Sequence, residues 1–346
     1  MIPTRRLGRT QLEVSRLGFG ANAIGNLYAA LDEDAARAAV DAAWSSGVRY
    51  YDTAPLYGYG LSERRLGDRL RAHPRDEYIL SSKVGRLLRP HGRGTPPRLS
   101  VAEGGIFEGA LPFRPEFDFS YDATLRSFED SLQRLGLARI DVLLIHDADA
   151  WTHGAAIDDR LREVETGALR ALRRLRDAGA IEAFGAGVNQ ASACERLMEL
   201  GDFDCFLLAG RYTLLEQDAL DGLLPRCVAA GVSIILGAPF NSGILATGAI
   251  TGARYNYQPA DAAILDRVAR IERVCAAHDV PLAAAALQFV LAHPAVASVI
   301  PGAKSAAEAH RNAELVTRPL PPALWSDLKA ERLLRADAPV PDQFLK

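Results

Sequence analysis

VRYYDTAPLYG, residues 48–58, is an apolar and aromatic run that stops at Asp52 and then turns towards Tyr57. Pro55 has no N–H group to donate to a sheet ladder, so a central strand cannot continue through it. The pattern therefore predicts a buried strand that ends at Asp52, with Tyr57 on the loop just beyond it.

Two other strand-like runs also end on a reactive side chain. Residues 78–82 (YILSS) are followed by Lys83, and residues 141–145 (DVLLI) are followed by His146. In an α/β barrel the carboxyl ends of all strands meet at one face, where such folds carry their active sites. An acid, a phenol, an ammonium group and an imidazole at strand ends therefore predict a single catalytic site.

Predicted strands and helices alternate along the chain. The strands are apolar and β-branched rather than alternating, as a sheet that is buried on both faces requires. This number of regular units favours an α/β fold of the (β/α)₈ TIM-barrel type over an open sheet. No G-x-G-x-x-G follows a strand to indicate a doubly wound dinucleotide fold. The strands are expected at residues 15–19, 48–53, 79–82, 141–145, 183–188, 204–208, 233–238 and 297–300.

Two segments stand outside this alternation. Residues 4–16 predict a hairpin ahead of the barrel. Residues 85–119 are rich in Gly, Pro and Arg and predict a long loop after the third strand, whose scattered apolar residues favour a substrate lid. No domain boundary is evident, so one domain over residues 1–346 is expected.

Five glycines are expected to close helices in the left-handed conformation, namely Gly47, Gly136, Gly179, Gly201 and Gly231.

Composition argues against several functional classes. A net charge of −3, with acids and bases interspersed, gives no electrostatic footprint for nucleic acid. The four cysteines lack C-x-x-C spacing, which argues against a structural metal site. The apolar tract 281–300 is interrupted by Gln288, His293 and Pro294, so it favours a buried helix and a strand over a membrane span. Without an apolar signal segment near its N-terminus, the chain is expected to be a cytoplasmic enzyme.

The strand-end side chains together suit redox chemistry at a carbon–oxygen bond. A phenol has a pKa of about 10, too high for a base at neutral pH, but an adjacent ammonium group lowers that pKa. A neutral imidazole can polarise a substrate oxygen, and a nicotinamide cofactor is the simplest hydride donor or acceptor. Taken singly, each side chain is more often structural, as a turn residue, a packed aromatic, a surface charge or a core histidine. Their common placement favours the catalytic interpretation.

Longer motifs resemble the aldo-keto reductase superfamily over nearly the whole chain. The matching segments are residues 52–63, 81–86, 146–147, 151–154 and 209–215. The resemblance implies a (β/α)₈ barrel that uses NAD(P)(H), with Tyr57 as the acid/base and Lys83 as the neighbour that lowers its pKa. It also implies that Asp52 is the partner of Lys83 and that His146 orients the substrate oxygen. Within the family, the chain is most similar to aldose 1-dehydrogenases acting on L-fucose, D-arabinose or L-galactose, and to pyridoxal 4-dehydrogenases.

The same resemblance implies a cofactor site that departs from the commoner family pattern. Asn189 and Gln190 replace a Ser-Asn pair that holds the carboxamide, and Gly237 replaces the tyrosine that stacks on the nicotinamide. Glu308 replaces an arginine that binds the 2′-phosphate of NADP, which favours NAD. Lys304 or Arg311 leaves NADP possible. The other implied cofactor residues are Pro239, Phe240, Asn241, Ser242, Gly243, Leu245, Gly302 and Asn312.

Amide and aromatic residues are the candidates for substrate binding. These groups suit a sugar, with hydroxyls at its rim and an apolar ring face, and they also suit a hydroxylated pyridine. Ordinary loop packing is the alternative for each of them. The candidates are Asn22, Asn26, Tyr28, Phe107 and Trp151.

The expected reaction is oxidation of the C1 hydroxyl of a cyclic aldose to a lactone, with Tyr57 accepting the hydroxyl proton. The alternatives are a pyridoxal 4-dehydrogenase, a general NADPH-dependent carbonyl reductase and, from a different class, a cofactor-bound regulatory subunit. The expected partner is a small molecule rather than nucleic acid or a membrane. The sequence leaves the oligomeric state open.

Overall fold

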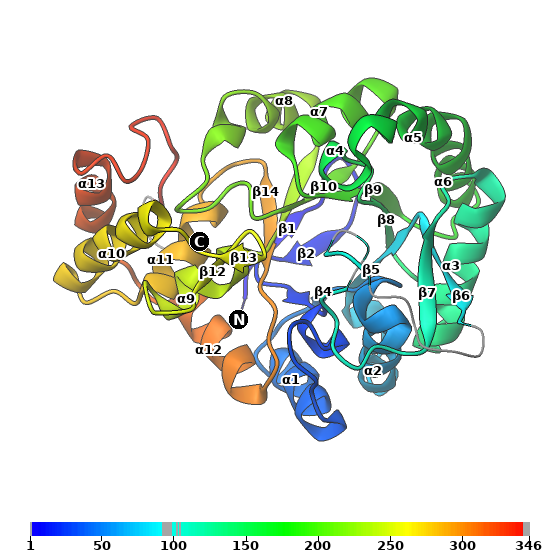
Figure 1. Ribbon diagram of the computed structural model, residues 1–346, viewed down its shortest axis with the longest axis horizontal. Helices are drawn as coiled ribbons and strands as arrows, with labels where there is room; N and C mark the ends of the chain where they lie inside the picture. Colours follow the sequence, from blue (N-terminus) through cyan, green and yellow to red (C-terminus); the bar gives the residue numbers. More distant parts are fainter. Residues whose placement is uncertain (1, 92–98, 102, 104, 342–346) are drawn as a thin grey trace.

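A computed structural model describes residues 2–91, 99–101, 103 and 105–341 and contains a central sheet of eight parallel strands (Figure 1). The sheet closes on itself, because Gly18 N–H donates to the Val299 carbonyl at 2.9 Å and Leu17 bridges Val299. The fold is therefore the (β/α)₈ barrel that the sequence predicts. In chain order the strands are β3 (Phe19–Gly20), β4 (Tyr50–Asp52), β5 (Ile79–Val84), β8 (Val142–His146), β9 (Ala183–Val188), β10 (Cys205–Ala209), β11 (Ser233–Gly237) and β14 (Val296–Ile300).

Helices surround the sheet, and side-chain caps begin several of them. Asp32 and Ser120 each accept a hydrogen bond from the backbone N–H three residues on, which satisfies a donor that the first helical turn leaves unpaired. The main outer helices are α1 (Glu33–Ser45), α2 (Leu61–Leu70), α3 (Tyr121–Leu135), α5 (Ile157–Glu163), α6 (Leu169–Asp177), α7 (Ala191–Leu200), α8 (Leu223–Ala230), α10 (Ala262–Ala277), α11 (Leu282–Leu291), α12 (Ala306–Thr317) and α13 (Pro322–Ala330).

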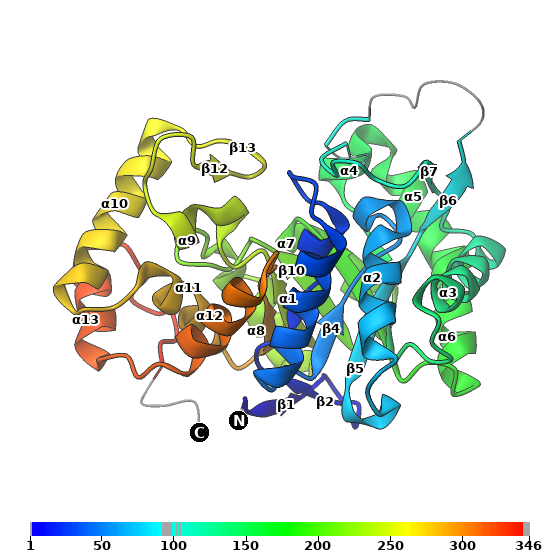
Figure 2. The same ribbon diagram turned by 90° about the horizontal axis from the view of Figure 1, so that it is seen from below.

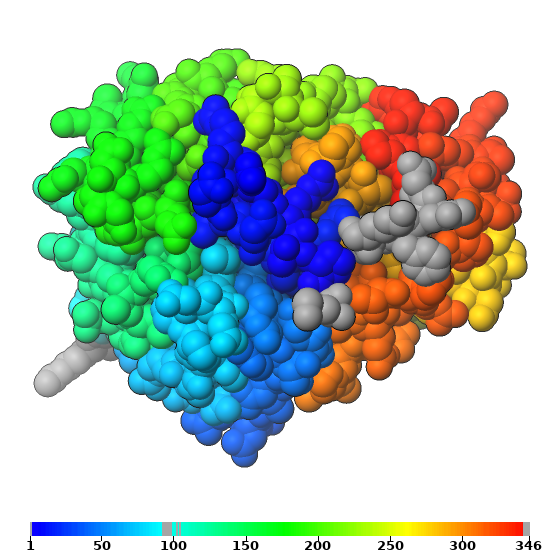
Figure 3. All heavy atoms as spheres, turned by 180° about the vertical axis from the view of Figure 1, so that it is seen from behind, coloured from blue at the N-terminus to red at the C-terminus, as the bar shows by residue number. Residues whose placement is uncertain are grey.

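The predicted N-terminal hairpin is present and closes the amino-terminal end of the barrel. Strands β1 (Thr4–Arg6) and β2 (Glu13–Ser15) pair antiparallel across it. Leu7, Leu12 and Val14 pack against side chains inside the barrel. In Figure 2 the hairpin lies at the end opposite β12 (Arg254–Tyr255) and β13 (Gln258–Pro259), and Figure 3 shows it across the middle of the rear face. Among the described residues, the hairpin therefore covers the end of the barrel opposite the carboxyl ends of the strands.

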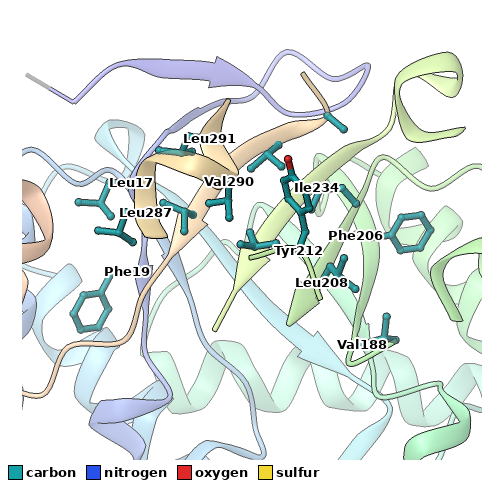
Figure 4. Close-up of a cluster of buried hydrophobic side chains, with 14 of the residues drawn as sticks. Leu17, Phe19, Val188, Phe206, Leu208, Tyr212, Ile234, Leu287, Val290 and Leu291 are labelled. Carbon is teal, nitrogen blue, oxygen red and sulfur yellow. The ribbon is translucent and has the colours of Figure 1, made fainter. Parts of the chain in front are cut away.

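The main core lies between the sheet and the helices. Figure 4 shows Phe206, Leu208 and Ile234 from the strands facing outward. Helix α11 is buried along residues 283–291, and β14 follows it, as predicted for the apolar tract. No single helix within the described ranges is long and apolar enough to cross a bilayer. Taken together, α10 and α11 have the length and composition of a membrane span, but the two helices are bent by 96° relative to each other.

Several local expectations need correction. Gly47, Gly136, Gly179 and Gly231 have positive φ, but Gly201 has φ −174° and is extended. The segment expected as a long loop begins and ends in an antiparallel ribbon of β6 (Arg86–Pro90) and β7 (Phe113–Phe117), because its flanking residues pair with each other. Residues 92–98, 102 and 104 of that segment lie outside the described residues. The segment after β11 contains α9 (Ile244–Thr247) and the β12–β13 hairpin.

Candidate active site

The four predicted catalytic side chains meet at the carboxyl end of the barrel. Asp52 ends β4, Lys83 lies on β5 and His146 ends β8, while Tyr57 begins a 3₁₀ turn after β4. Lys83 Nζ donates to Asp52 Oδ1 at 2.6 Å and lies 4.6 Å from the centroid of the Tyr57 ring. The Tyr57 and His146 rings meet edge to face, with centroids 5.9 Å apart. The sequence therefore identified four residues that share one site.

The Lys83–Asp52 ion pair is buried and fully hydrogen-bonded. Lys83 Nζ also donates to the Thr53 carbonyl at 2.9 Å, and Ser81 Oγ donates to Asp52 Oδ2 at 2.7 Å. Burial lowers the pKa of Lys83, but the neighbouring Asp52 and Tyr57 outweigh it and raise that pKa overall. Lys83 is therefore a charged ammonium group at neutral pH.

Burial controls the protonation of the other two groups. It raises the pKa of Tyr57 above its ordinary value, and Lys83 only partly opposes this effect. Lys83 does lower the pKa of Tyr57, as expected. The effect of burial is larger, however, so the pKa of Tyr57 is raised overall, against the expectation. Burial, with Lys83 and Arg86 nearby, holds the pKa of His146 well below its usual range, so the imidazole is neutral.

A tight turn positions Tyr57. Gly58, the next residue, has φ +62°, and a Cβ on it would lie 2.6 Å from the Gly25 carbonyl oxygen. Only glycine fits this close approach without moving the backbone. The contact presses the Tyr57 turn against the loop after β3 and holds the phenol at the strand ends.

Two adjoining cavities open at this end of the barrel. A cavity of about 110 Å³ is lined by all four catalytic candidates. A wider cleft of about 560 Å³ runs from it towards α12, and its size is that of an ordinary small-molecule or cofactor site. The residues that line both are Asn22, Leu27, Asn189, Ala209, Ala238 and Tyr257.

The comparisons with known proteins agree with this geometry. The sequence model of the Aldo/keto reductase family matches residues 16–331. The chain belongs to the aldo/keto reductase family. A pyridoxal 4-dehydrogenase from Microbacterium luteolum is 40% identical over 336 residues, which cover 95% of this chain and 97% of that protein. A D-threo-aldose 1-dehydrogenase from Pseudomonas sp is 40% identical over 324 residues, which cover 93% of this chain and 95% of that protein.

Solved structures support the same fold. The holo form of an aldo-keto reductase from Bacillus halodurans superimposes with a TM-score of 0.75 and 26% identity, covering 99% of both chains. This aldo/keto reductase is therefore an oxidoreductase that acts on CH–OH donors, and dehydrogenases of its family use the nicotinamide cofactors NAD(P).

The wider cleft of this aldo/keto reductase fits such a cofactor. The buried Asn241 Oδ1 has no hydrogen-bond partner within the described part of the chain, whereas its Nδ2 donates to the Gly210 carbonyl at 3.0 Å. A polar ligand in the cleft would satisfy that oxygen. Of the implied cofactor residues, those that line the cleft are Asn189, Pro239, Phe240, Asn241, Ser242, Gly243, Gly302, Lys304, Glu308, Arg311 and Asn312.

Two implied cofactor residues lie outside that lining. Gln190 Oε1 accepts the backbone N–H of Trp151 at 2.9 Å, so its amide holds a neighbouring loop. Leu245 is fully buried in the main core. Both assignments followed the family pattern along the chain, and they stay predictions.

The substrate candidates divide in a similar way. Asn22, Phe107 and Trp151 line the smaller cavity, and the Phe107 ring lies 5.8 Å from that of Tyr57. Tyr28 lines the cofactor cleft instead. Asn26 lines neither cavity and is structural, because its Nδ2 donates to the Glu108 carbonyl while its Oδ1 accepts from Leu31 and Arg65.

The structure also brings in side chains that sequence reasoning missed. Tyr257, on the turn between β12 and β13, donates to Asn189 Oδ1 at 3.3 Å and stacks on Trp151 with centroids 5.9 Å apart. Arg86 and Asp147 line the smaller cavity. The sequence signal for Tyr257 is weak: it is one of two tyrosines in the loop motif Tyr255-Asn256-Tyr257. Arg86 and Asp147 are the last residues of two segments, 81–86 and 146–147, that the sequence had matched to the family without assigning these two residues a role.

Proposed function

We propose that this aldo/keto reductase oxidises the C1 hydroxyl of a cyclic aldose to a lactone, with NAD as the hydride acceptor. The observation that carries the proposal is the buried cluster of Tyr57, charged Lys83 and neutral His146 in a cavity that joins a cofactor-sized cleft. The similarity to a D-threo-aldose 1-dehydrogenase supports the substrate class.

Each side chain has a separate task in this reaction. NAD supplies the acceptor for the hydride that leaves C1, and the lining of the wider cleft would hold it. Tyr57 accepts the proton of the C1 hydroxyl, so that a C=O bond forms as the C–H bond breaks. Lys83 favours the phenolate that accepts the proton, and Asp52 keeps Lys83 in place. His146 donates a hydrogen bond to the reacting oxygen while it remains neutral.

The same site also suits oxidation of the hemiacetal form of pyridoxal. The specific observation in favour is the 40% identity to a pyridoxal 4-dehydrogenase over 95% of this chain. Phe107 and Trp151 on the cavity wall could pack against a pyridine ring as well as against the apolar face of a sugar. The two candidates share the bond that breaks and the role of Tyr57, so they differ only in substrate.

Initial rates distinguish these functions. We expect NAD reduction with at least one of L-fucose, D-arabinose and L-galactose, followed by the absorbance of the reduced cofactor. Turnover of pyridoxal alone would keep the chemistry and replace the substrate. Absence of turnover with all four compounds and both NAD and NADP would contradict the proposed function, and aldehyde reduction by NADPH would then be measured.

Glu308 is proposed to set the preference for NAD. It lines the cofactor cleft at the start of α12, where its carboxylate accepts the Lys304 backbone N–H at 3.0 Å. The same carboxylate lies 3.8 Å from Lys304 Nζ and offsets the cation that a 2′-phosphate would use. A negative charge at this place repels a phosphate and can accept a hydrogen bond from a ribose hydroxyl.

Neutralising this charge should shift cofactor preference. We expect Glu308→Gln, which keeps a hydrogen-bond acceptor for Lys304, to improve NADP binding relative to NAD by about tenfold. The two dissociation constants are measured by titration calorimetry. Glu314→Gln removes an exposed charge from the same helix but away from the cleft, and should leave the ratio unchanged. An unchanged ratio in Glu308→Gln would exclude this role for Glu308.

A further inference from the structure

A buried ion pair on the wall of the catalytic cavity takes no part in the steps above. Arg86 donates to Asp147 Oδ2, and both residues line the cavity that contains Tyr57 and His146. Both side chains are almost completely buried, with exposed fractions of 2% and 9%. Charged groups are seldom buried inside a small cavity unless their partners or a ligand compensate for the lost water.

We propose that Asp147 is a specificity-determining residue, whose carboxylate accepts a hydrogen bond from a second substrate hydroxyl next to the reacting carbon. In an aldose this hydroxyl is on the adjacent carbon, C2. In pyridoxal hemiacetal its counterpart is the phenolic hydroxyl, which is one carbon further from the reacting carbon. The inference rests on the proposed function, because it concerns the substrate of that same site. It restricts the substrate class to hemiacetals that carry such a neighbouring hydroxyl.

The position of Asp147 relative to His146 supports this role. Asp147 Oδ2 lies 3.5 Å from His146 Nε2. When Nε2 faces the reacting oxygen, the carboxylate beside it lies about one hydrogen-bond length further along the cavity wall. In an aldose, the oxygens on C1 and C2 are separated by a similar step. One substrate can therefore contact the imidazole and the carboxylate at the same time.

The backbone of Asp147 turns its carboxylate into the cavity. Its φ is +55°, a left-handed conformation that a non-glycine residue adopts only at a cost in free energy. Strained residues of this kind gather at functional sites. Asp149, two residues on, is instead extended, and its carboxylate caps α4 (Ala150–His153) through the Thr152 N–H. The two neighbouring aspartates thus differ, since one serves the fold and the other faces the cavity.

Asp147 keeps acceptor capacity for a ligand. Its Oδ1 accepts from Asn189 Nδ2 at 3.2 Å, and its Oδ2 accepts from Arg86. An ionised carboxylate can accept about four hydrogen bonds, so room for a substrate hydroxyl remains. Arg86 is held from its other side by the Phe117 ring, whose centroid lies 4.0 Å from its guanidinium carbon. The carboxylate is therefore fixed in direction before a substrate arrives.

Paired substrates test this role directly. We compare kcat/KM for D-arabinose with 2-deoxy-D-ribose, for L-fucose with 2-deoxy-L-fucose, and for pyridoxal with 3-deoxypyridoxal. We expect wild-type enzyme to prefer the hydroxylated member of a pair that it turns over by about 10- to 100-fold, the range for a hydrogen bond to a charged group. Asp147→Ala should bring that ratio close to one, and Asp147→Asn should give an intermediate ratio.

Asp141→Asn is the matched control. Asp141 is also a buried carboxylate paired with an arginine, Arg75, at 2.6 Å, but it directly precedes β8 and lies at the opposite end of that strand. A loss of fold stability alone would affect both aspartate variants, whereas only the Asp147 variants should lose the preference. Circular dichroism and Tm establish that each variant is folded.

The outcomes separate the two proposals. Turnover of a hemiacetal with no preference in the wild type, or with a preference that Asp147→Asn and Asp147→Ala both retain, would overturn the role of Asp147 and leave the proposed function intact. If Asp147→Ala does not fold, the role of Asp147 is tested by comparing the kcat/KM ratio of the paired substrates in the wild type with the ratio in Asp147→Asn. Absence of turnover with every pair would overturn both proposals.

Discussion

Tyr57→Phe should reduce kcat for hydroxyl oxidation by about 10²- to 10⁴-fold, the contribution of a positioned acid/base group. The variant removes one oxygen from a partly buried ring and leaves its contacts with Phe107 and His146 in place, so the fold should be retained. We expect the NAD dissociation constant to stay within a factor of about two, since the hydroxyl acts on substrate. Stopped-flow rates and titration calorimetry measure the two quantities separately.

The pH profile gives an independent measure of the same role. Burial raises the pKa of Tyr57, so the neutral phenol predominates at neutral pH in the free enzyme. Oxidation needs the phenolate, whose fraction grows about tenfold per pH unit below that pKa. We therefore expect kcat/KM for oxidation to rise with pH from neutral into the alkaline range. A rise that persists unchanged in Tyr57→Phe would show that another group is the base.

Lys83→Met should remove both activity and stability. Methionine has a similar length but no charge, so it leaves the Asp52 carboxylate buried at 1% exposure without its counter-ion. Loss of one partner of a buried pair costs about 3–5 kcal/mol in the free energy of unfolding. We expect a decrease of that size in urea unfolding, together with loss of turnover.

A double variant separates the two effects. Asp52→Asn combined with Lys83→Met removes both charges and should recover most of the lost free energy of unfolding, because no unpaired ion remains. Turnover should stay absent, since nothing then favours the Tyr57 phenolate. Lys304→Met is the control for loss of an exposed lysine charge and should change stability little. Turnover restored in the double variant would contradict the role given to Lys83.

Much of the fold follows from local sequence patterns. Continuous apolar strands separated by helices predict parallel strands buried on both faces, and such strands close into a barrel. Because the carboxyl ends of parallel strands share one face, Asp52, Lys83 and His146 could be assigned to one site without coordinates. The glycine rule failed only at Gly201, where the chain leaves the helix in an extended conformation.

Contacts between distant residues were decided only by the tertiary structure. Arg86 and Asp147 are separated by 61 residues and Asn189 and Tyr257 by 68, and no periodicity links either pair. Asn26 shows the converse case. The sequence predicted that it binds substrate, whereas its side chain forms a hydrogen bond that holds two loops together.

Protonation also depended on the folded chain. The sequence by itself determined the barrel, the four strand-end groups and the chemistry that they suit. It could not determine the net direction of the Tyr57 pKa, because burial and the field of Lys83 oppose each other and only their three-dimensional arrangement decides which prevails. The charges on the cavity wall beside His146 also depended on the tertiary structure, because Arg86 after β5 and Asp147 after β8 meet only through the pairing of these two strands.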